Sequence, residues 1–498
     1  MNSVFDVLQQ GRDNATAIAT PGAASMPYRE LRDTVQRLVT QLQSVGVQTS
    51  DRVAIVLNNG PDMAVMFLAA ASCAAAAPLN PRYRREEFQF YLEDLGAKVL
   101  ITRAGEAPEA EAAVPDSVQH LTLEGRGKDL HLLADAGVED SEVRYAGRDD
   151  VALVLHTSGT TSRPKIVPLR QRNLAASARN IAAVLQLTEQ DTCLNVMPLF
   201  HIHGLIAGLL APLSAGGAVA CTPGFDGFRF FDWLDELRPT WYTAVPTMHQ
   251  MVLARSGKHR DIIQRVPLRF ARSSSASLPT PVLEQITETF GIPVIEAYGM
   301  TEATHQMSSN PLPPDLQKPG SVGKATGIEM AVMDETGKLL PAHVRGEVVI
   351  RGTTVIDAYE NNPDANTAAF TNGWFRTGDQ GYFDDDGYLF LTGRLKEIIN
   401  RGGEKISPLE VDEVLLRHDG VAQAVTFALP HAKLGEEVAA AVVLRDGVQT
   451  TEEDIRAYAA EHLADFKVPR KVLFLSEIPK GPTGKVQRIG LAEKLELT

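Results

Sequence analysis

The sequence predicts an α/β protein with a large N-terminal domain of parallel sheets covered by helices, an antiparallel β subdomain within it, and a small α+β C-terminal domain. Three observations predict this class. Before about residue 320, short β-rich segments alternate with helical patterns, which is typical of parallel sheets covered by helices. Beyond it, short strands and turn residues follow one another at hairpin spacing. The 498 residues also exceed what one hydrophobic core holds, about 250–300 residues.

Strand-like segments in the N-terminal domain are short and apolar, and helical patterns separate them. In such folds the carboxyl ends of the parallel strands border the ligand site. We therefore expect functional residues directly after these segments. The predicted strands cover residues 52–59, 97–103, 151–157, 241–247 and 291–299, and a helix starts at Met63.

The last part of the chain has its own set of elements. Helices are predicted over 408–418 and 452–463, and strands over AVTFALP, AAAVVL and KVLFLSEIP. These elements suffice for a separate domain of about one hundred residues. We expect the N-terminal domain to cover residues 1–395, with its β-rich subdomain at about 320–393, and the C-terminal domain to cover residues 396–498.

Composition disfavours several function classes. The 44% hydrophobic and 22% charged fractions are ordinary for a globular protein. A formal net charge of −14 argues against non-specific nucleic-acid binding, which needs a basic face. Two apolar stretches are interrupted by Pro78 and Pro212, so each predicts a buried helix followed by a strand rather than a membrane span. With three scattered cysteines and no signal-peptide pattern, we expect reduced thiols and a cytoplasmic location.

A hydroxyl-rich segment, TSGTTSRPK, begins at the end of the predicted strand 151–157. It differs from a Walker loop, because the second glycine is absent and Ile166 stands where a magnesium-binding hydroxyl is required. Its hydroxyls, backbone N–H groups and lysine suit an anion-binding nest, although a solvated polar turn has the same composition. The candidate phosphate-binding residues are Thr157, Ser158, Gly159, Thr160, Thr161 and Lys165.

Three further blocks accompany this segment: EAYGMTEATHQM (296–307), GWFRTGDQGYFDDDGYLFLTGRLKEIINRGGEKISPLEVDEVL (373–415) and PKGPTGKVQR (479–488). In this order and at these spacings, the four blocks resemble the adenylate-forming superfamily of acyl-CoA synthetases, luciferases and peptide-synthetase adenylation domains. The resemblance covers nearly the whole chain. It implies that a carboxylate attacks the α-phosphorus of ATP, which gives acyl-AMP and pyrophosphate, and that the acyl group then passes to a thiol such as coenzyme A.

The resemblance also assigns the nucleotide site. Thr301 would contact the α-phosphate, and Glu302 would help to hold Mg²⁺, which prefers oxygen ligands. Lys485 would reach both the incoming carboxylate and the α-phosphate. Asp379, with Arg394, would hold the ribose hydroxyls, although an aspartate after Thr-Gly also caps turns. The backbone of Glu296, Ala297, Tyr298 and Gly299 would line the adenine, and Ser275, Ala276 and Met300 would belong to the rest of the nucleotide site.

A mobile C-terminal domain is a further implication of the resemblance. Lys396 occupies the hinge position, and rotation about it would carry Lys485 away and bring the segment RGGEK to the active site. The glycines of that segment would leave room for the pantetheine arm of coenzyme A. The candidate gate and CoA-side residues are His201, Arg401, Gly402 and Gly403.

The phosphate segment departs from the commoner TSGTTGxPKG at two positions, Ser162 and Ile166. The glycines that are absent here allow positive φ, so the detailed conformation of the loop does not follow from the resemblance. Ser-Arg in this loop is one feature of the oxalyl-CoA synthetase branch.

The expected acid pocket is polar. The segments that line it in the family supply His203, Arg272, Ser275 and His305 in this chain. Imidazole, guanidinium and hydroxyl groups suit a short acid with a second carboxylate, because a buried anion must be paired or hydrogen-bonded. Together with the Ser-Arg loop and the histidine after MTEA, they resemble the oxalyl-CoA synthetase branch and predict oxalate as the substrate. Arg272 could instead be a salt-bridged structural residue, and His201 only a gate.

Other functions stay open at this stage. The nearest alternative is a CoA ligase for malonate, another short acid or a medium-chain fatty acid. A stand-alone module that loads a carrier protein would use the same first step. A light-emitting oxygenase needs a large apolar pocket, which the polar residues disfavour. A non-enzymatic ATP-binding protein fits least, because Thr301, Glu302, Asp379 and Lys485 are all present.

Overall fold

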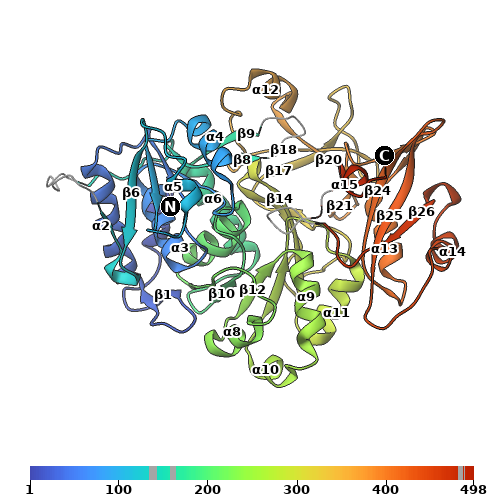
Figure 1. The fold of residues 1–498 in the computed structure, drawn as a ribbon, viewed down its shortest axis with the longest axis horizontal. Helices are drawn as coiled ribbons and strands as arrows, with labels where there is room; N and C mark the ends of the chain where they lie inside the picture. Colours follow the sequence, from blue (N-terminus) through green and yellow to red (C-terminus); the bar gives the residue numbers. More distant parts are fainter. Residues whose placement is uncertain (134–142, 158–163, 480–485, 487, 498) are drawn as a thin grey trace.

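Two large, mainly parallel β-sheets form the N-terminal part of the molecule, in blue and green in Figure 1. The computed structural model describes residues 1–133, 143–157, 164–479, 486 and 488–497. In the first sheet the hairpins β6–β7 and β8–β9 are antiparallel and the other pairings are parallel. Its order is β7 (His131–Leu133), β6 (Gln119–Glu124), β5 (Val99–Thr102), β3 (Arg52–Ile55), β4 (Ala75–Pro78), β8 (Val151–Thr157) and β9 (Lys165–Arg170).

The second sheet carries parallel strands in its centre and antiparallel strands at both edges. Its order is β16 (Lys324–Ala325), β15 (His305–Ser309), β14 (Val294–Met300), β13 (Phe270–Ser273), β12 (Trp241–Ala244), β10 (Thr192–Asn195), β11 (Ala218–Cys221), β1 (Thr16–Ala19) and β2 (Met26–Pro27). The predicted parallel sheets are thereby confirmed. The strand predicted over 241–247 is shorter, because Pro246 starts a helix instead, a position that suits its fixed φ.

One helix shows why both sheets share a core. In α3 (Pro61–Cys73), every residue from Met63 to Cys73 is buried, and an apolar surface on all sides of a helix requires protein on all sides. It leads directly into β4, as predicted for this apolar stretch. The main core cluster joins α3 to residues of both sheets, for example Leu153 of β8 and Trp241 of β12.

The other N-terminal helices are α1 (Val4–Leu8), α2 (Tyr28–Ser44), α4 (Arg85–Leu95), α5 (Pro108–Glu111), η1 (Gly127–Asp129), α6 (Gln171–Val184), α7 (Ala211–Ser214), α8 (Phe230–Leu237), α9 (Pro246–Ser256), α10 (Arg260–Arg265) and α11 (Thr280–Phe290). Figure 1 shows several of them, such as α2, α6 and α11, beside the two sheets.

A π-helix, η2 (His203–Leu210), replaces the regular helix expected in the second apolar stretch. All of its residues are buried. Gly208 packs against Asn195 of β10, where a Cβ atom would lie 2.5 Å from the side-chain amide. Such wide turns are rare and occur often at functional sites, and this one begins with His203.

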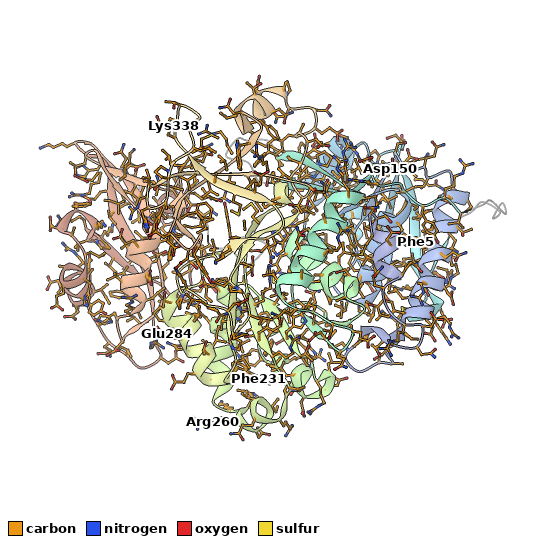
Figure 2. All side chains as sticks on the ribbon, turned by 180° about the vertical axis from the view of Figure 1, so that it is seen from behind. Phe5, Asp150, Phe231, Arg260, Glu284 and Lys338 are labelled. Carbon is orange, nitrogen blue, oxygen red and sulfur yellow. The ribbon has the colours of Figure 1, made fainter. Side chains whose placement is uncertain are left out.

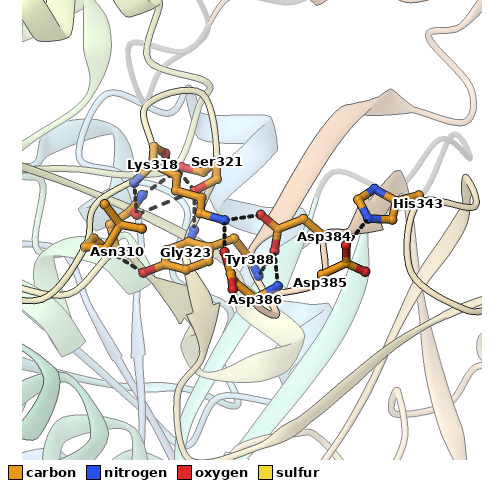
Figure 3. Close-up of polar contacts among 10 residues, drawn as sticks. Asn310, Lys318, Ser321, Gly323, His343, Asp384, Asp385, Asp386 and Tyr388 are labelled. Atoms are coloured by element: carbon orange, nitrogen blue, oxygen red, sulfur yellow. Dashed lines mark hydrogen bonds and ion pairs between the residues drawn. The ribbon is translucent and has the colours of Figure 1, made fainter.

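An antiparallel sheet, in yellow and orange in Figure 1, follows the two large sheets as predicted. Its strands are β17 (Glu329–Met333), β18 (Gly346–Arg351), β20 (Trp374–Phe383), β19 (Phe370–Thr371) and β21 (Leu389–Arg394), with α12 (Pro363–Ala369) before β19. Figure 3 shows how the turn between β20 and β21 is attached to the loop between β15 and β16. The ammonium group of Lys318 lies 2.5 Å from Asp384 and 2.6 Å from Asp386.

The C-terminal part, in red in Figure 1, is an α+β unit with its own apolar clusters. Its elements are β22 (Ile399–Arg401), β23 (Glu404–Ile406), α13 (Pro408–Leu416), β24 (Val421–His431), β25 (Gly435–Leu444), α14 (Glu452–His462), η4 (Asp465–Lys467), β26 (Lys471–Phe474) and α15 (Leu491–Lys494). A cavity of about 430 Å³ separates the end of α13 from α11, whose Glu284 faces this part in Figure 2. Within the described ranges, no helix has the length and apolar character needed to span a bilayer.

Candidate active site

The carboxyl ends of β13 and β14 lead directly into candidate site residues, as the parallel sheet predicts. Ser275 follows β13, and Thr301 and Glu302 follow β14. The 3-10 turn η3 (Thr301–Ala303) then reverses the chain, and β15 runs back beside β14 starting at His305. A single hairpin therefore carries residues expected at the phosphates and residues expected at the acid.

Arg272 of β13 is the centre of the acid-side group. Its side chain is fully buried, and its Nη2 donates to Gln306 Oε1 at 2.8 Å and to His305 Nε2 at 3.2 Å. Its Nη1 donates to His203 Nε2 at 3.3 Å and to Thr243 Oγ1 at 3.4 Å. All of these partners are neutral oxygen or nitrogen acceptors, and among the described residues Arg272 forms no ion pair.

Burial lowers the pKa of Arg272 to about 9, which leaves the guanidinium charged at neutral pH. Its Nε atom is also buried and makes no hydrogen bond to the described part of the chain. A buried charge is costly unless it is paired or hydrogen-bonded. The group formed by Arg272 and its four acceptors, which we call the arginine cluster, thus holds a positive charge that the described protein groups do not neutralise.

The two histidines of the arginine cluster are neutral on hydrogen-bond grounds. Their rings are stacked at a centroid distance of 4.8 Å, and each turns its Nε2 toward an Arg272 donor. A ring nitrogen that accepts from a guanidinium carries no proton, so His203 bears its proton on Nδ1, 3.0 Å from Ser275 Oγ. The prediction that His203, Ser275, His305 and Arg272 lie together agrees with this arrangement. Thr243 and Gln306 were not predicted.

Three residues at or next to the arginine cluster have an unfavourable backbone conformation. Ser275, Thr304 and His305 have φ values of 73°, 53° and 85° without being glycine. Non-glycine residues adopt this region uncommonly, and residues in it are frequent at ligand sites. Gly299 is required by the same turn, because a Cβ atom there would lie 1.7 Å from the carbonyl oxygen of His305.

Tyr298, Asp379 and Arg394 form the group expected at the ribose. Asp379 and Arg394 are paired across β20 and β21, with Arg394 Nε 3.1 Å from Asp379 Oδ1. The hydroxyl of Tyr298 donates to the other oxygen of Asp379. Burial, reinforced by the carboxylate, raises the pKa of Tyr298 well above its ordinary value, so the hydroxyl stays a donor. The remaining predicted neighbours are Ala276, which is exposed, Ala297, which is buried, and Met300, which is half-buried.

Glu302, Tyr359 and Lys165 form the group expected at the phosphates. Glu302 is 7% exposed, and its Oε1 accepts a hydrogen bond of 2.8 Å from the Tyr359 hydroxyl. The ammonium group of Lys165 lies 4.3 Å from the centre of the Tyr359 ring. Half-buried Thr301 precedes Glu302. Tyr359 was not predicted, because its link to Glu302 spans 57 residues and no motif before α12 indicated it.

The phosphate segment joins the two strands of a β-hairpin. Thr157 ends β8 and lies opposite Lys165, the first residue of β9. Ser158, Gly159, Thr160 and Thr161 lie outside the described residues. Ile166 now has an explanation: its side chain is 5% exposed in an apolar cluster with Val154, and its carbonyl accepts from Glu360 N at 3.1 Å. A glycine there would lack the side chain that fills this cluster.

Glu296 differs from the other adenine-side candidates because its side chain borders a cavity. This cavity, of about 440 Å³, is also lined by Asn310 and Lys318. Glu296 is 6% exposed, and its buried Oε2 makes no hydrogen bond within the described structure. Burial raises the pKa of Glu296 to about 8, so the carboxyl group is mostly protonated at neutral pH.

The hinge and gate candidates are in separate places. Exposed Lys396 follows β21. Gly402 and Gly403 have φ values of 61° and 100° and form the two-residue turn between β22 and β23, a geometry that favours Gly-Gly. Arg401 Nε lies 2.5 Å from Glu437.

The gate candidate, His201, is half-buried. Its Nδ1 accepts a hydrogen bond from the backbone N–H of His203, so it borders the arginine cluster. Lys485 lies outside the described residues.

One buried carboxylate among the described residues is a candidate metal ligand. Among the described residues, no group of three or more histidine, cysteine, aspartate or glutamate side chains is arranged to hold a metal ion. Glu302 nevertheless offers a buried carboxylate beside the expected phosphates, and Mg²⁺ commonly binds one or two carboxylates and takes its other ligands from phosphates and water. The residues present therefore fit a magnesium ion that arrives with a nucleotide.

Comparison with known proteins places these features in a family. Residues 5–360 match the model of the AMP-binding enzyme, and residues 410–485 match the AMP-binding enzyme C-terminal domain. An oxalate–CoA ligase of Arabidopsis thaliana is 50% identical over 483 residues, which cover 95% of this chain and 94% of that protein. An oxalate–CoA ligase of Saccharomyces cerevisiae is 39% identical over 528 residues, with 99% and 96% covered.

Comparison with solved structures gives the same family. The ATP-bound crystal structure of MatB from Rhodopseudomonas palustris superimposes with a TM-score of 0.90 at 30% identity, over 100% of this chain and 99% of that one. The apo structure of the same protein gives a TM-score of only 0.80. The present arrangement therefore matches the ATP-bound form of MatB better than its apo form. With two family models and full-length relatives in agreement, this chain belongs to the AMP-binding enzyme family.

Proposed function

We propose that the protein is an AMP-forming acid–CoA ligase that converts oxalate, ATP and coenzyme A into oxalyl-CoA, AMP and pyrophosphate. The observation that carries the choice of acid is the arginine cluster, where Arg272 is buried and charged but has only neutral partners among the described residues. A small dianion would supply the missing countercharge with one carboxylate and present the other to ATP. The names of the oxalate–CoA ligases that this chain resembles support the same acid.

Adenylation would take place where the hairpin of β14 and β15 turns. A carboxylate oxygen of the acid attacks the α-phosphorus, a new P–O bond forms, and the bond to pyrophosphate breaks. Negative charge grows on the phosphoryl oxygens, so positioned donors and cations lower the barrier. We assign this role to Thr301 and Lys485, with Lys165 and the loop residues Thr157 to Thr161 at the departing phosphates.

Nucleotide binding would rest on the groups described above. Asp379 accepts from the ribose hydroxyls while Arg394 holds its carboxylate in place, and Tyr298 fixes the second oxygen. A magnesium ion bound by Glu302 would neutralise phosphate charge, and Tyr359 would orient that carboxylate through its 2.8 Å hydrogen bond.

Thioester formation would follow in a second arrangement. We propose that residues 396–498 move as one domain against residues 1–395, with Lys396 as the hinge. The thiolate of coenzyme A then attacks the acyl carbon, and AMP leaves with the electron pair of the broken C–O bond. Gly402 and Gly403, at the tip of the β22–β23 hairpin, have no side chain that could obstruct the pantetheine arm.

The test is AMP release, in the presence of ATP, magnesium and coenzyme A, over a panel of acids. The panel contains oxalate, malonate, glycolate, acetate, a medium-chain fatty acid and benzoate. We expect oxalate to give the highest kcat/KM. A higher value for malonate or for the fatty acid would refute the choice of acid. No AMP release with any acid would refute the ligase activity itself.

A further inference from the structure

We propose that Gln306 determines the specificity for a dianionic acid, because its neutral amide supports Arg272 without neutralising it. This inference rests on the proposed function and names the residue that keeps the positive charge of the arginine cluster available. Gln306 belongs to β15, lies opposite Gly299 of β14, and is fully buried.

The orientation of the Gln306 amide is fixed from both sides. Arg272 has only donors, so the group that lies 2.8 Å from its Nη2 must be the amide oxygen. The amide nitrogen then donates to Thr326 Oγ1 at 3.2 Å. The hydroxyl of Thr326 in turn donates to the carbonyl oxygen of Met307 at 3.1 Å. Gln306 is therefore held in one position and holds Nη2 of Arg272 in one position.

A glutamate at this position would have nearly the same shape but the opposite effect on charge. Its carboxylate would lie within ion-pairing distance of Arg272, and the Thr326 hydroxyl could rotate to donate to it. A buried guanidinium with no ion pair to the described residues would then gain a permanent counterion, which stabilises the fold. The same counterion would repel the second carboxylate of the acid. The side chain at position 306 thus decides whether the counterion of Arg272 is the protein or the substrate.

This arrangement explains why the arginine cluster is built from neutral acceptors. His203, His305, Thr243 and Gln306 accept hydrogen bonds from Nη1 and Nη2 of the guanidinium, and these acceptors carry no net charge. Hydrogen bonds reduce the cost of burying the charge, while the electrostatic attraction for an anion is kept. Stability and acid binding then make opposite demands on residue 306, as is common at functional sites.

The experiment compares Gln306→Glu with Gln306→Met in the full-length enzyme. Melting temperature, the KM for oxalate and the KM for ATP are measured for each. For Gln306→Glu we expect a higher melting temperature than in the wild type, a KM for oxalate raised about 30-fold or more, and an unchanged KM for ATP. Gln306→Met removes the acceptor without adding charge, so we expect a lower melting temperature and a smaller rise in the KM for oxalate.

A second readout uses glycolate, in which an alcohol replaces one carboxylate of oxalate. The ratio of kcat/KM for oxalate to that for glycolate should fall in Gln306→Glu and change less in Gln306→Met. If Gln306→Glu is less stable than the wild type, fails to fold, or keeps the wild-type KM for oxalate, the proposal is wrong.

The outcome is separable from that of the proposed function. An enzyme that prefers another acid in the panel refutes the choice of oxalate, whereas the melting temperatures still test whether a carboxylate at position 306 pairs with Arg272.

Discussion

His305 illustrates how much of the site depends on a single side chain and its backbone. It is 1% exposed, has a φ of 85°, and accepts from Arg272 while its ring stacks on His203. The strained backbone places the imidazole against the guanidinium at the very start of β15. A residue with this conformation is maintained by its surroundings rather than by its own preference.

Replacing His305 with alanine should raise the KM for oxalate about tenfold or more and leave the KM for ATP unchanged, because a buried donor of Arg272 loses its acceptor. Steady-state kinetics with each substrate varied in turn measures this. His343→Ala is the control, since His343 is exposed and its ion-pair partner, Asp385, is exposed too (Figure 3). Equal losses for oxalate and ATP would contradict the assignment to the acid pocket.

Glu296 gives a prediction about pH. Its pKa rises from the ordinary 4.5 to about 8 on folding, mainly through burial. Between these values the folded protein holds a proton that the unfolded chain has released, so this group lowers stability progressively as the pH rises from 4.5 to 8. The amide side chain introduced by Glu296→Gln has nearly the same shape and no proton to lose.

We therefore expect Glu296→Gln to be more stable than the wild type at pH 8 and above, with an advantage that shrinks toward pH 5. Urea unfolding across this range measures the difference, on the order of a few kcal/mol at its largest. Glu284→Gln, which makes the same substitution at an exposed position of α11, is the matched control. A pH-independent difference for Glu296→Gln would show that the carboxyl group is not protonated in the fold.

At the scale of elements, the hairpin of β14 and β15 carries both the residues proposed to bind the phosphates and those proposed to bind the acid. The strands are in register with Gly299 opposite Gln306 and Met300 opposite His305, and η3 fills the turn between them. The close approach at Gly299 is what allows so short a reversal. Tyr359 joins from outside the hairpin and fixes the carboxylate of Glu302.

Gly299→Ala tests this close approach. The added Cβ atom would lie 1.7 Å from a backbone carbonyl oxygen, so the hairpin must shift, at a cost of about 1–3 kcal/mol or more. We expect a lower urea midpoint and weaker binding of oxalate and ATP together. Gly257→Ala, at a helical φ of −58° with open space around it, is the control and should be neutral or slightly stabilising. Equal stability of the two variants would rule out the tight packing described here.

At the scale of the whole molecule, the C-terminal part is joined internally by charged groups. Arg488, which follows the PTGK segment, pairs with Asp412 of α13 and lies 3.7 Å from Glu397, next to the proposed hinge. Arg488 thereby connects the end of the described chain to the residue that follows the proposed hinge. We therefore expect residues 396–498 to move as one body in the proposed second arrangement.

Lys485→Ala should abolish adenylation but spare thioester formation from presynthesised oxalyl-AMP, because only the first step needs a cation at the α-phosphate. Pyrophosphate exchange and single-turnover formation of oxalyl-CoA measure the two steps. Lys494→Ala, on α15 of the same domain, serves as the control and should leave both rates unchanged. Failure of both steps alike in Lys485→Ala would contradict the two-arrangement scheme.

The sequence predicted what depends on local patterns. Strand β8 was predicted with its observed ends, and α13 within two residues at its C-terminus, because their apolar residues recur at the right spacing and turn or capping residues follow or precede them. It also predicted the fold class, and its four motif blocks indicated the family that the comparisons identify. Motif positions likewise predicted the groups around Arg272 and Asp379 as neighbours, although their roles remain to be tested.

The features that the sequence did not predict depend on contacts between residues that are distant in the chain. Whether Arg272 would be salt-bridged or available could not be decided, because its partners come from three other elements. Tyr359 and Thr243 became site candidates only when the sheets brought them beside Glu302 and His203. The π-helix of η2 also has no distinct apolar period in so uniformly apolar a segment. The packing of Ile166 could not be predicted either, because its apolar cluster is assembled from residues that are distant in the sequence, such as Ala54 and Phe88.

The shared hairpin has a consequence for how this enzyme can diversify. Thr301 and Glu302 are separated from His305 and Gln306 by only two residues, so an insertion or deletion between them would displace the proposed phosphate contacts and the proposed acid contacts at once. On α/β scaffolds, new specificities usually come from loops of different length. The length of the turn between β14 and β15 cannot change in this way without displacing both groups. We therefore expect new acid preferences to arise by point substitution within a turn of constant length, which favours small changes of charge, as at position 306, over changes in the size of the acid.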